Sequence, residues 1–429
     1  MPNDIEAPHD ALSPDERDTL MKRARPRRDL PLVAQSPAHR RLPLAGSSRA
    51  IDQAMRPLYA VWEVTLACNL ACRHCGSRAA HARPDELTTA ECLDLVDQLA
   101  EMGVHEVSLI GGEAYLRPDW CEIIRRICEN DMIALLTTGG RGLTPELARD
   151  AAAAGLGTAS VSIDGNQATH DRLRGVKGSY DAALTAMRNL RAAGIPVSAN
   201  TQINRLSMPE LSDVLETIIA AGAHSWQIQI TVAMGRAADE PDILLQPYDL
   251  LELFPLLGRL KERCKEADVV LWPGNNVGYF GPFETALRGS MARGHGGSCS
   301  AGRSGLGIES DGTIKGCPSL ATGTWAAGNI REHRLVDLWE RSARLRYIRD
   351  RTVDDLWGFC RTCYYATHCM AGCTWTSEAL FGKPGNNPLC HHRALEHQRL
   401  GKRERFVQIE QAPGEPFDQG RFELIVEDL

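Results

Sequence analysis

The strongest constraint on the fold of this chain is a strand-then-helix pattern that repeats six times between residues 58 and 236. The predicted strands cover 60–66, 105–110, 132–137, 157–163, 195–203 and 225–231. The helical stretches between them begin at signals such as the capping box Thr88-x-x-Glu91 and end at glycines such as Gly155. This alternation predicts a parallel sheet with right-handed crossovers. Six units are too few for a closed eight-stranded barrel.

Three cysteines follow the first predicted strand, with the spacing Cys-x3-Cys-x2-Cys: Cys68, Cys72 and Cys75. Three closely spaced thiolates can hold three irons of a [4Fe–4S] cluster, because soft thiolate ligands suit iron–sulfur clusters. The loop lacks a fourth cysteine, so the fourth iron would be open to another ligand. The alternatives are a zinc site, which normally closes with four ligands, another metal, or chance.

A second array of seven cysteines lies in the C-terminal part of the chain: Cys299, Cys317, Cys360, Cys363, Cys369, Cys373 and Cys390. The alternatives here are a disulfide framework or zinc knuckles. A disulfide framework would need an oxidising compartment. Zinc would explain a Cys-x2-Cys pair but not the whole pattern joined to the first three cysteines. The chain has 14 cysteines, and the other four lie in helix-like segments, where we expect small buried apolar residues.

Together these motifs resemble the radical S-adenosylmethionine (SAM) superfamily, in members with a C-terminal SPASM domain that binds two auxiliary [4Fe–4S] clusters. The resemblance implies three [4Fe–4S] clusters and bound SAM as cofactors. It also implies the fold: a partial (β/α)6 barrel of the TIM-barrel type, followed by a small cysteine-rich SPASM domain. His74 departs from the family pattern, since the position before the third cysteine is usually aromatic.

By the same resemblance, the first three cysteines hold the SAM-cleaving cluster and are the catalytic residues. Cys360, Cys363, Cys369 and Cys390 would ligate the distal auxiliary cluster, and Cys299, Cys317 and Cys373 the nearer one. The nearer cluster is then one ligand short. An upstream residue such as His295, or the substrate, could complete it.

Polar and glycine motifs stand at the ends of the predicted strands, where barrels of this kind gather their chemistry. The resemblance makes them candidates for binding SAM: Gly111, Gly112, Glu113, Thr138, Ser162, Asp164, Asn200 and Gln229. Glycines allow close approach of a ligand to the backbone. Asp164-Gly165 is also ordinary turn chemistry. Arg174 is expected to pair with a carboxylate, either of a ligand or within the protein.

The sequence divides into five predicted segments. They are a flexible leader at 1–57, with one short helix near 14–24, a radical SAM core at 58–240, a bridging segment at 241–295, a SPASM domain at 296–395 and a tail at 396–429. The tail holds a short apolar segment that could form an added edge strand or be disordered.

The net charge of −7 gives no support for broad nucleic-acid binding. No run of 18 apolar residues predicts a membrane span. Many cysteines with no apolar signal segment predict a cytoplasmic protein. The resemblance implies an oxidoreductase that cleaves SAM to a 5′-deoxyadenosyl radical and oxidises or cross-links a ribosomally made peptide or protein side chain.

The resemblance also implies partners: a peptide substrate, an electron donor such as flavodoxin or ferredoxin, and a separate peptide-recognition protein. A tetrapyrrole or cofactor-biosynthesis enzyme is the alternative. An iron–sulfur electron carrier or redox sensor is the alternative without catalysis.

Overall fold

The structure is a computed structural model that describes residues 43–288 and 299–429. The helix expected near 14–24 and the candidate ligand His295 lie outside the described residues. The described residues belong to one compact unit. In the described part of the chain, no helix combines the length and apolarity needed to cross a membrane.

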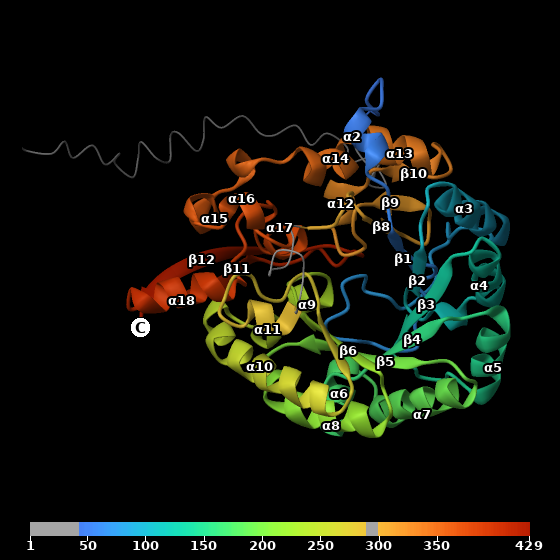
Figure 1. The fold of residues 1–429 in the computed structure, drawn as a ribbon, viewed down its shortest axis with the longest axis horizontal. Coiled ribbons are helices and arrows are strands. Elements are labelled where there is room, and N and C mark those ends of the chain that lie inside the picture. The colour runs from blue at the N-terminus through green and yellow to red at the C-terminus, as the bar shows by residue number, and fades with distance from the viewer. Residues whose placement is uncertain (1–42, 289–298) are drawn as a thin grey trace, which may run out of the picture. The chain divides into compact units, whose positions relative to one another are not determined.

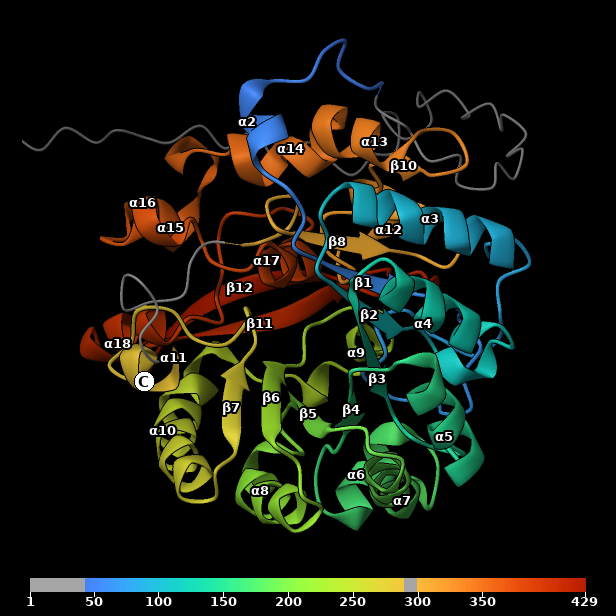
Figure 2. The same ribbon diagram turned by 45° about the vertical axis from the view of Figure 1, so that its right-hand side comes forward.

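A single ten-stranded sheet, in the order β10-β9-β8-β1-β2-β3-β4-β5-β6-β7, organises the fold (Figures 1 and 2). Its strands are β1 Tyr59–Glu63, β2 Glu106–Ile110, β3 Ile133–Thr138, β4 Thr158–Ser162, β5 Val197–Ile203, β6 Ser225–Ile230, β7 Val270–Pro273, β8 Gly305–Ile308, β9 Thr313–Lys315 and β10 Gly328–Asn329. Strands β1 to β8 pair in parallel, and β9 and β10 are antiparallel. The six predicted strands are β1 to β6, so the expected partial barrel is confirmed.

Helices cover one face of this sheet (Figure 2). Those that connect or follow β1 to β6 are α3 Thr89–Glu101, α4 Trp120–Glu129, α5 Pro145–Ala154, α6 Gln167–Arg174, α7 Ser179–Ala192, α8 Leu211–Ala220 and α10 Leu250–Glu266. Thr88 caps α3 through the predicted capping box. Gly155 ends α5 in the left-handed conformation, as a C-cap glycine does.

The remaining helices are short. They are α2 Ala50–Ala54, α9 Arg236–Asp239, α11 Glu284–Arg288, α12 Thr322–Trp325, α13 Leu335–Arg341, α14 Ala343–Asp350, α15 Gly358–Thr362, α16 Ala366–Cys369, α17 Thr374–Phe381 and α18 His391–Arg399. Single 3₁₀ turns are η1 Ala114–Leu116, η2 Met208–Glu210, η3 Pro241–Ile243, η4 Pro247–Asp249 and η5 Val353–Asp355.

The two faces of the sheet differ in polarity because side chains alternate along each strand. On the helix-covered face, residues such as Trp62, Leu109 and Trp226 are fully buried in the core. We call the opposite face the inner face. On β4 to β7 it carries Ser160, Ser162, Ser198, Asn200, Gln202, Ser225, Gln227, Gln229, Val270 and Trp272. This surface lines the inside of the partial barrel, and it is uncharged, polar on β4 to β6 and apolar on β7.

The sheet extends past the six predicted strands on both sides. β7 comes from the bridging segment and pairs with β6. β8 comes from the cysteine-rich region and pairs in parallel with β1, from Tyr59 opposite Gly305 to Trp62 opposite Ile308. The predicted core and SPASM segments therefore share one sheet.

The tail forms a two-stranded antiparallel hairpin of its own, β11 Lys402–Glu410 and β12 Arg421–Asp428. The apolar tail segment is thus a strand, and it pairs within the tail rather than on the edge of the main sheet. Phe406 and Phe422 pack edge to face across the hairpin, with ring centroids 5.6 Å apart, and both join the main core.

Candidate radical SAM site

The loop with the first three cysteines is built directly against the glycine motif that follows β2. Gly112 N–H donates to Thr65 O (2.8 Å), and Glu113 N–H donates to Ala67 O (2.8 Å). A Cβ on Gly112 would lie 2.0 Å from Ala67 O and 2.8 Å from the Cβ of Cys68. Gly111 has a φ of +154°, and a Cβ there would lie 2.3 Å from Thr65 O. Both glycines are therefore needed for the two loops to touch, whatever further contact they make with SAM.

Each of the three sulfurs has a hydrogen-bonding neighbour. Leu70 N–H donates to Cys68 Sγ (3.4 Å), Arg174 Nη1 donates to Cys72 Sγ (3.6 Å), and the Ser77 hydroxyl lies 3.5 Å from Cys75 Sγ. Burial is the largest cause that raises the pKa of Cys68 to about 12 and of Cys72 to about 11. Metal binding deprotonates such thiols outright. Grouped cysteines with donors to their sulfurs fit a [4Fe–4S] cluster.

Asp164 ties this loop to the rest of the barrel. Its fully buried carboxylate accepts from His74 Nε2 (2.9 Å) and Gln202 N–H (2.9 Å) and pairs with Arg174 Nη2 (2.6 Å). Burial alone would raise the pKa of Asp164, but the Arg174 guanidinium and His74 hold it below its usual range. Asp164 therefore organises the cysteine loop through internal contacts, and Arg174 makes an ion pair within the protein.

Glu113 is buried, and its carboxylate accepts hydrogen bonds from other residues of the protein. Its carboxylate accepts from the Thr138 hydroxyl, through a short contact, and from Gly139 N–H (2.7 Å). Burial is the main cause that raises its pKa to about 7. The candidates Glu113 and Thr138 thus form one buried pair that joins the ends of β2 and β3.

The other predicted SAM contacts lie on the inner face. Ser162 on β4 is directly opposite Asn200 on β5, and Gln229 on β6 is opposite Gln202. The Oδ1 atom of Asn200 is buried and has no hydrogen-bond partner within the protein. Gln202 Nε2 donates to Gln229 Oε1 (3.4 Å). Ser162 and Asn200 thus present adjacent polar groups to a ligand in the barrel.

The structure brings the seven C-terminal cysteines together in two groups. Burial and then the charges of Cys299 and Cys317 raise the pKa of Cys373 to about 12. Burial and the nearby Cys390, Cys360 and Cys363 likewise raise the pKa of Cys369. In the described residues, no three His, Cys, Asp or Glu side chains converge as ligands of one metal ion. A cluster needs a looser arrangement, because each thiolate binds a different iron.

Tyr279 lies between these two cysteine groups. Its hydroxyl accepts from Cys373 N–H (3.0 Å), and its carbonyl accepts from Cys390 Sγ (3.6 Å). A Cβ on Gly372 would lie 2.4 Å from the tyrosine ring, so a glycine is required beside it. Gly307 has a similar role on the inner face of β8, since its Cβ would lie 2.4 Å from the carbonyl carbon of Cys317. Cys317 therefore lies against the inside of the barrel.

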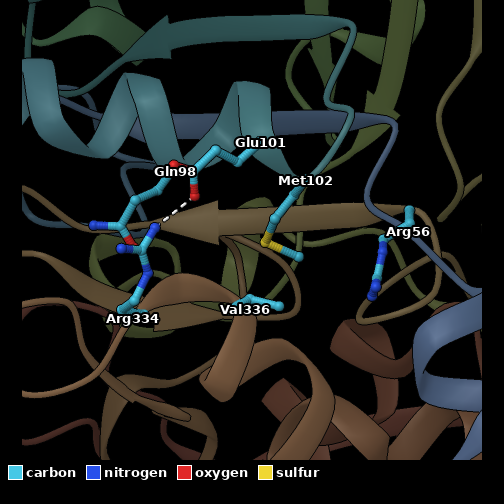
Figure 3. A pocket seen from close by; sticks show the side chains of 6 residues that line it. All are labelled: Arg56, Gln98, Glu101, Met102, Arg334 and Val336. Carbon is cyan, nitrogen blue, oxygen red and sulfur yellow. Dashed lines mark hydrogen bonds and ion pairs between the residues drawn. The ribbon is translucent and has the colours of Figure 1, made fainter.

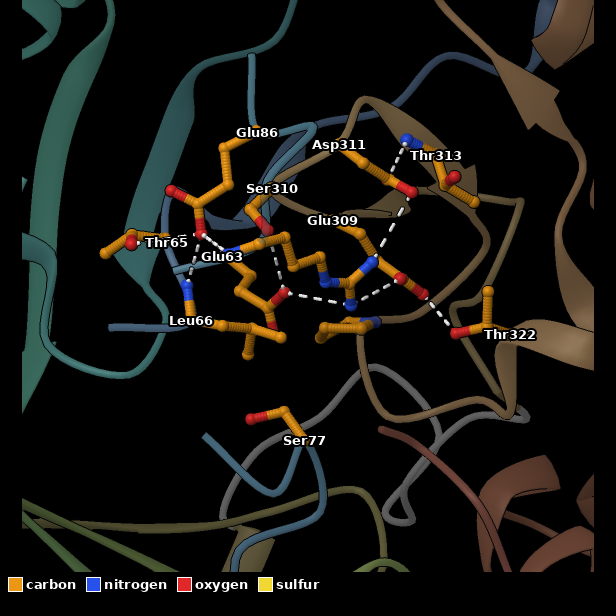
Figure 4. Close-up of polar contacts among 12 residues, drawn as sticks. Glu63, Thr65, Leu66, Ser77, Glu86, Glu309, Ser310, Asp311, Thr313 and Thr322 are labelled. Atoms are coloured by element: carbon orange, nitrogen blue, oxygen red, sulfur yellow. Dashed lines mark hydrogen bonds and ion pairs between the residues drawn. The ribbon is translucent and has the colours of Figure 1, made fainter. Parts of the chain in front are cut away.

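A buried charge cluster joins the end of β1 to β8 and β9 (Figure 4). Arg83 Nη2 is 2.9 Å from Glu309 and 3.4 Å from Glu63, and Arg83 Nη1 is 3.4 Å from Asp311. Lys315 Nζ is 2.8 Å from Glu309. Three carboxyl groups thus face two cations. Burial raises the pKa of Glu63 to about 8, against the attraction of Arg83, so a proton on Glu63 balances the cluster.

We expect Glu63→Gln to remove a pH dependence of stability. A carboxyl whose pKa is raised in the folded state stabilises the protein below its unfolded value, near 4.5, and this contribution is lost as the pH rises through about 8. As the pH rises from 5 to 8, the melting temperature of the unmodified protein should therefore fall relative to that of the variant. The control is Glu146→Gln, at an exposed carboxylate. A melting-temperature difference that stays constant with pH contradicts the assignment.

The loop between β11 and β12 reaches back to the cysteine loop. Phe417 N–H donates to Gly76 O (3.0 Å), and Asp418 Oδ1 accepts from Arg78 Nε (2.8 Å). Lys315 Nζ lies 3.7 Å from the centroid of the Phe417 ring. The tail therefore contacts the first cysteine loop on one side and the residues before Cys317 on the other.

We expect Asp418→Ala to destabilise the protein by about 1–3 kcal/mol, because the largely buried Arg78 loses a charged partner. Asp418 also accepts from Glu415 N–H (2.9 Å), so the turn should loosen. Thermal unfolding measures the stability, and electron paramagnetic resonance of the reduced first cluster reports on the cysteine loop. The control is Glu415→Ala in the same loop, at an exposed side chain. Equal melting temperatures of the two variants would show that the tail does not support the site.

A small surface pocket between α3 and α13 is unrelated to these groups (Figure 3). Its volume is about 120 Å³, well below the roughly 300–1,000 Å³ of ligand pockets. It is lined by Arg56, Gln98, Glu101, Met102, Arg334 and Val336, with an ion pair between Arg334 and Glu101 (2.5 Å). None of them is a predicted site residue, so we assign the pocket no role.

Comparison with known proteins identifies the class. The profile of the radical SAM superfamily matches residues 62–220, and that of SPASM, an iron–sulfur cluster-binding domain, matches residues 299–364. An AdoMet-dependent heme synthase from Methanosarcina barkeri is 31% identical over 79% of this chain and 97% of its own length. Mycofactocin maturase MftC from Mycobacterium tuberculosis is 30% identical over 80% of this chain and 86% of its own length.

Solved structures share the fold. The structure of anSMEcpe with bound AdoMet superposes with a TM-score of 0.60 at 15% identity, over 79% of this chain and 95% of that one. SuiB from Streptococcus suis bound to S-adenosylmethionine gives a TM-score of 0.59 at 18% identity, over 75% of this chain and 74% of that one.

This chain therefore belongs to the radical SAM superfamily and carries a C-terminal SPASM region. It is an enzyme whose cofactors are SAM, a [4Fe–4S] cluster and auxiliary iron–sulfur clusters. The number of auxiliary clusters and the ligand set of each stay predictions.

Sequence reasoning missed several residues that the structure places at the site. The role of His74 could have been found from its departure from the family pattern, because a histidine there calls for a polar partner. Arg83, Tyr279 and Asp418 gave no such signal, since their partners lie far away in the sequence.

Proposed function

We propose that this enzyme uses the 5′-deoxyadenosyl radical to oxidise or cross-link a side chain of a ribosomally made peptide. Cys68, Cys72 and Cys75 would hold the SAM-cleaving cluster, and the seven C-terminal cysteines two auxiliary clusters. SAM, when bound to the first cluster, supplies the radical that removes a hydrogen atom from the substrate. The residues of this chain hold the cysteine loop in place, present polar groups to SAM and shape the substrate space.

One observation carries the choice of a peptide: strands β1 to β8 contain no Lys, Arg or His. Tetrapyrrole substrates bear several carboxylates, and burying a carboxylate without a cationic partner is costly. Two cations at the rim are already paired, Arg83 with Glu309 and Arg174 with Asp164. Amides and hydroxyls line β4 to β6 instead, and these groups hydrogen-bond well to an uncharged peptide backbone.

A tetrapyrrole is the second candidate substrate. It is supported by the heme synthase relative, 97% of whose length is matched. A second relative, named Fe-coproporphyrin III synthase, is 32% identical over 43% of this chain. The maturase relative supports a peptide to a similar degree, and SuiB has been solved with its precursor peptide SuiA.

The experiment compares the two substrate classes in parallel reactions. The cluster-loaded, reduced enzyme is given SAM together with synthetic copies of short peptides encoded beside its gene, and in parallel with Fe-coproporphyrin III. We expect one peptide to lose two hydrogens by mass spectrometry, with 5′-deoxyadenosine formed in proportion. Turnover of Fe-coproporphyrin III while every peptide stays unchanged would make the peptide assignment wrong.

Two partners complete the proposal. A flavodoxin or ferredoxin would donate the electron for SAM cleavage. A separate peptide-recognition protein would present the substrate. Adding that protein should lower the KM for the peptide without changing the rate of SAM cleavage in the absence of peptide.

A further inference from the structure

An exposed tryptophan stands on the inner face of β7. The Trp272 side chain is 60% exposed, whereas most large apolar side chains of the sheet are buried. Trp272 is opposite Gln227 on β6, and the next pair along, Trp226 and Leu271, is buried on the helix-covered face. Because neighbours across parallel strands share a face, the indole lies on the inner face with Gln227. A large apolar ring is therefore open to contact on this face, at the β7 end of the sheet.

The strand register places this indole in one row with the predicted SAM contacts. Ser162 on β4, Asn200 on β5, Gln227 on β6 and Trp272 on β7 are successive partners across the sheet. Adjacent strands are about 5 Å apart, so Trp272 lies about 10 Å from Asn200 along the row. A ligand held at Ser162 and Asn200 therefore has Gln227 and Trp272 as its next neighbours.

The chemistry of the row changes along its length. At Asn200 the buried Oδ1 atom has no partner within the protein, and Ser160 Oγ, two residues before Ser162 on β4, is also buried without one. Buried polar groups are normally hydrogen-bonded, so these two atoms can pair with a ligand bound on this face. Gln227 is exposed and offers both an amide donor and an acceptor. Trp272 adds a large apolar ring with no charge beside it on β6 or β7.

We propose that Gln227 and Trp272 form a substrate subsite that takes an uncharged peptide segment, with an aromatic or large apolar side chain stacked on the Trp272 indole. Gln227 hydrogen-bonds to the peptide backbone beside that side chain. This inference rests on the proposed function, since it takes the substrate to be a peptide. It goes further by naming the residues that select which peptide segment lies next to SAM.

The test compares three variants of the cluster-loaded, full-length enzyme: Trp272→Ala, Trp272→Phe and the control Leu400→Ala, which truncates a side chain 71% exposed at the end of α18. The probe is whichever synthetic peptide the unmodified enzyme converts. Truncating an aromatic anchor should raise the KM for this peptide about thirtyfold. Trp272→Phe should keep the KM within about threefold, because a phenyl ring still stacks. The peptide-independent formation of 5′-deoxyadenosine should stay unchanged in all three variants.

The outcomes separate this inference from the proposed function. If the unmodified enzyme converts a peptide and Trp272→Ala has the same KM, the subsite is wrong and the peptide function survives. If it converts only Fe-coproporphyrin III, or neither probe, the peptide function fails and the subsite fails with it. A fall in peptide-independent SAM cleavage that Trp272→Phe does not restore would show a structural role for Trp272 and overturn the subsite. A thirtyfold KM effect that Leu400→Ala lacks supports it.

Discussion

Replacing Cys68, Cys72 and Cys75 together with alanine should abolish SAM cleavage and leave the other clusters in place. These thiols lie in one loop, each sulfur has its own hydrogen-bonding neighbour, and the triple substitution removes every predicted ligand of this cluster. By the predicted ligand sets, iron should fall from about 12 to about 8 atoms per chain. The measurements are 5′-deoxyadenosine formed by the reduced protein and iron per chain after anaerobic reconstitution.

The control for this experiment removes two other cysteines, Cys121 and Cys128, which lie on α4 at partly buried positions. Their alanine variants should keep both SAM cleavage and iron. Continued 5′-deoxyadenosine production by the triple variant would refute the assignment. Stoichiometric zinc in place of iron in the protein purified anaerobically, without iron–sulfur absorbance, would refute the clusters altogether. Point substitutions are preferable to truncation at residue 296, because truncation would remove β8, the direct neighbour of β1.

Arg174→Met should destabilise the protein by about 3–5 kcal/mol, because it leaves the carboxylate of Asp164 buried without its cation. It also removes the donor to Cys72 Sγ, so the first cluster should be lost more readily than the auxiliary ones. Thermal unfolding measures the first effect, and loss of about a third of the iron on mild chelation measures the second.

The matched control is Arg149→Met, at an exposed ion pair with Glu146 on α5. Solvent screens exposed pairs of this kind and they contribute little to stability, so its melting temperature should barely move. A second variant, Arg174→Lys, keeps the charge but not the planar fork of donors. It should recover part of the stability. If Arg174→Met melts like the control, the ion pair does not organise the cysteine loop.

The sequence by itself determined the six-unit barrel core and the two cysteine arrays. Periodicity, helix caps and C-cap glycines are local signals, and β1 to β6 lie within a few residues of their predicted positions. The cysteine spacing carries its meaning without any three-dimensional information, because ligands that share a cluster loop must be close in sequence. The grouping of Cys299, Cys317 and Cys373 came from the resemblance and stays a prediction.

Only the tertiary structure decided how these parts meet. β8 joins the sheet although two of its four residues are glycine, which has low strand propensity, so its place depends on pairing with β1. Asp164 meets His74, and Asp418 meets Arg78, across long sequence separations that no local pattern records. The inner-face row from Ser162 to Trp272 likewise exists only through strand register, which is set between strands and not within them.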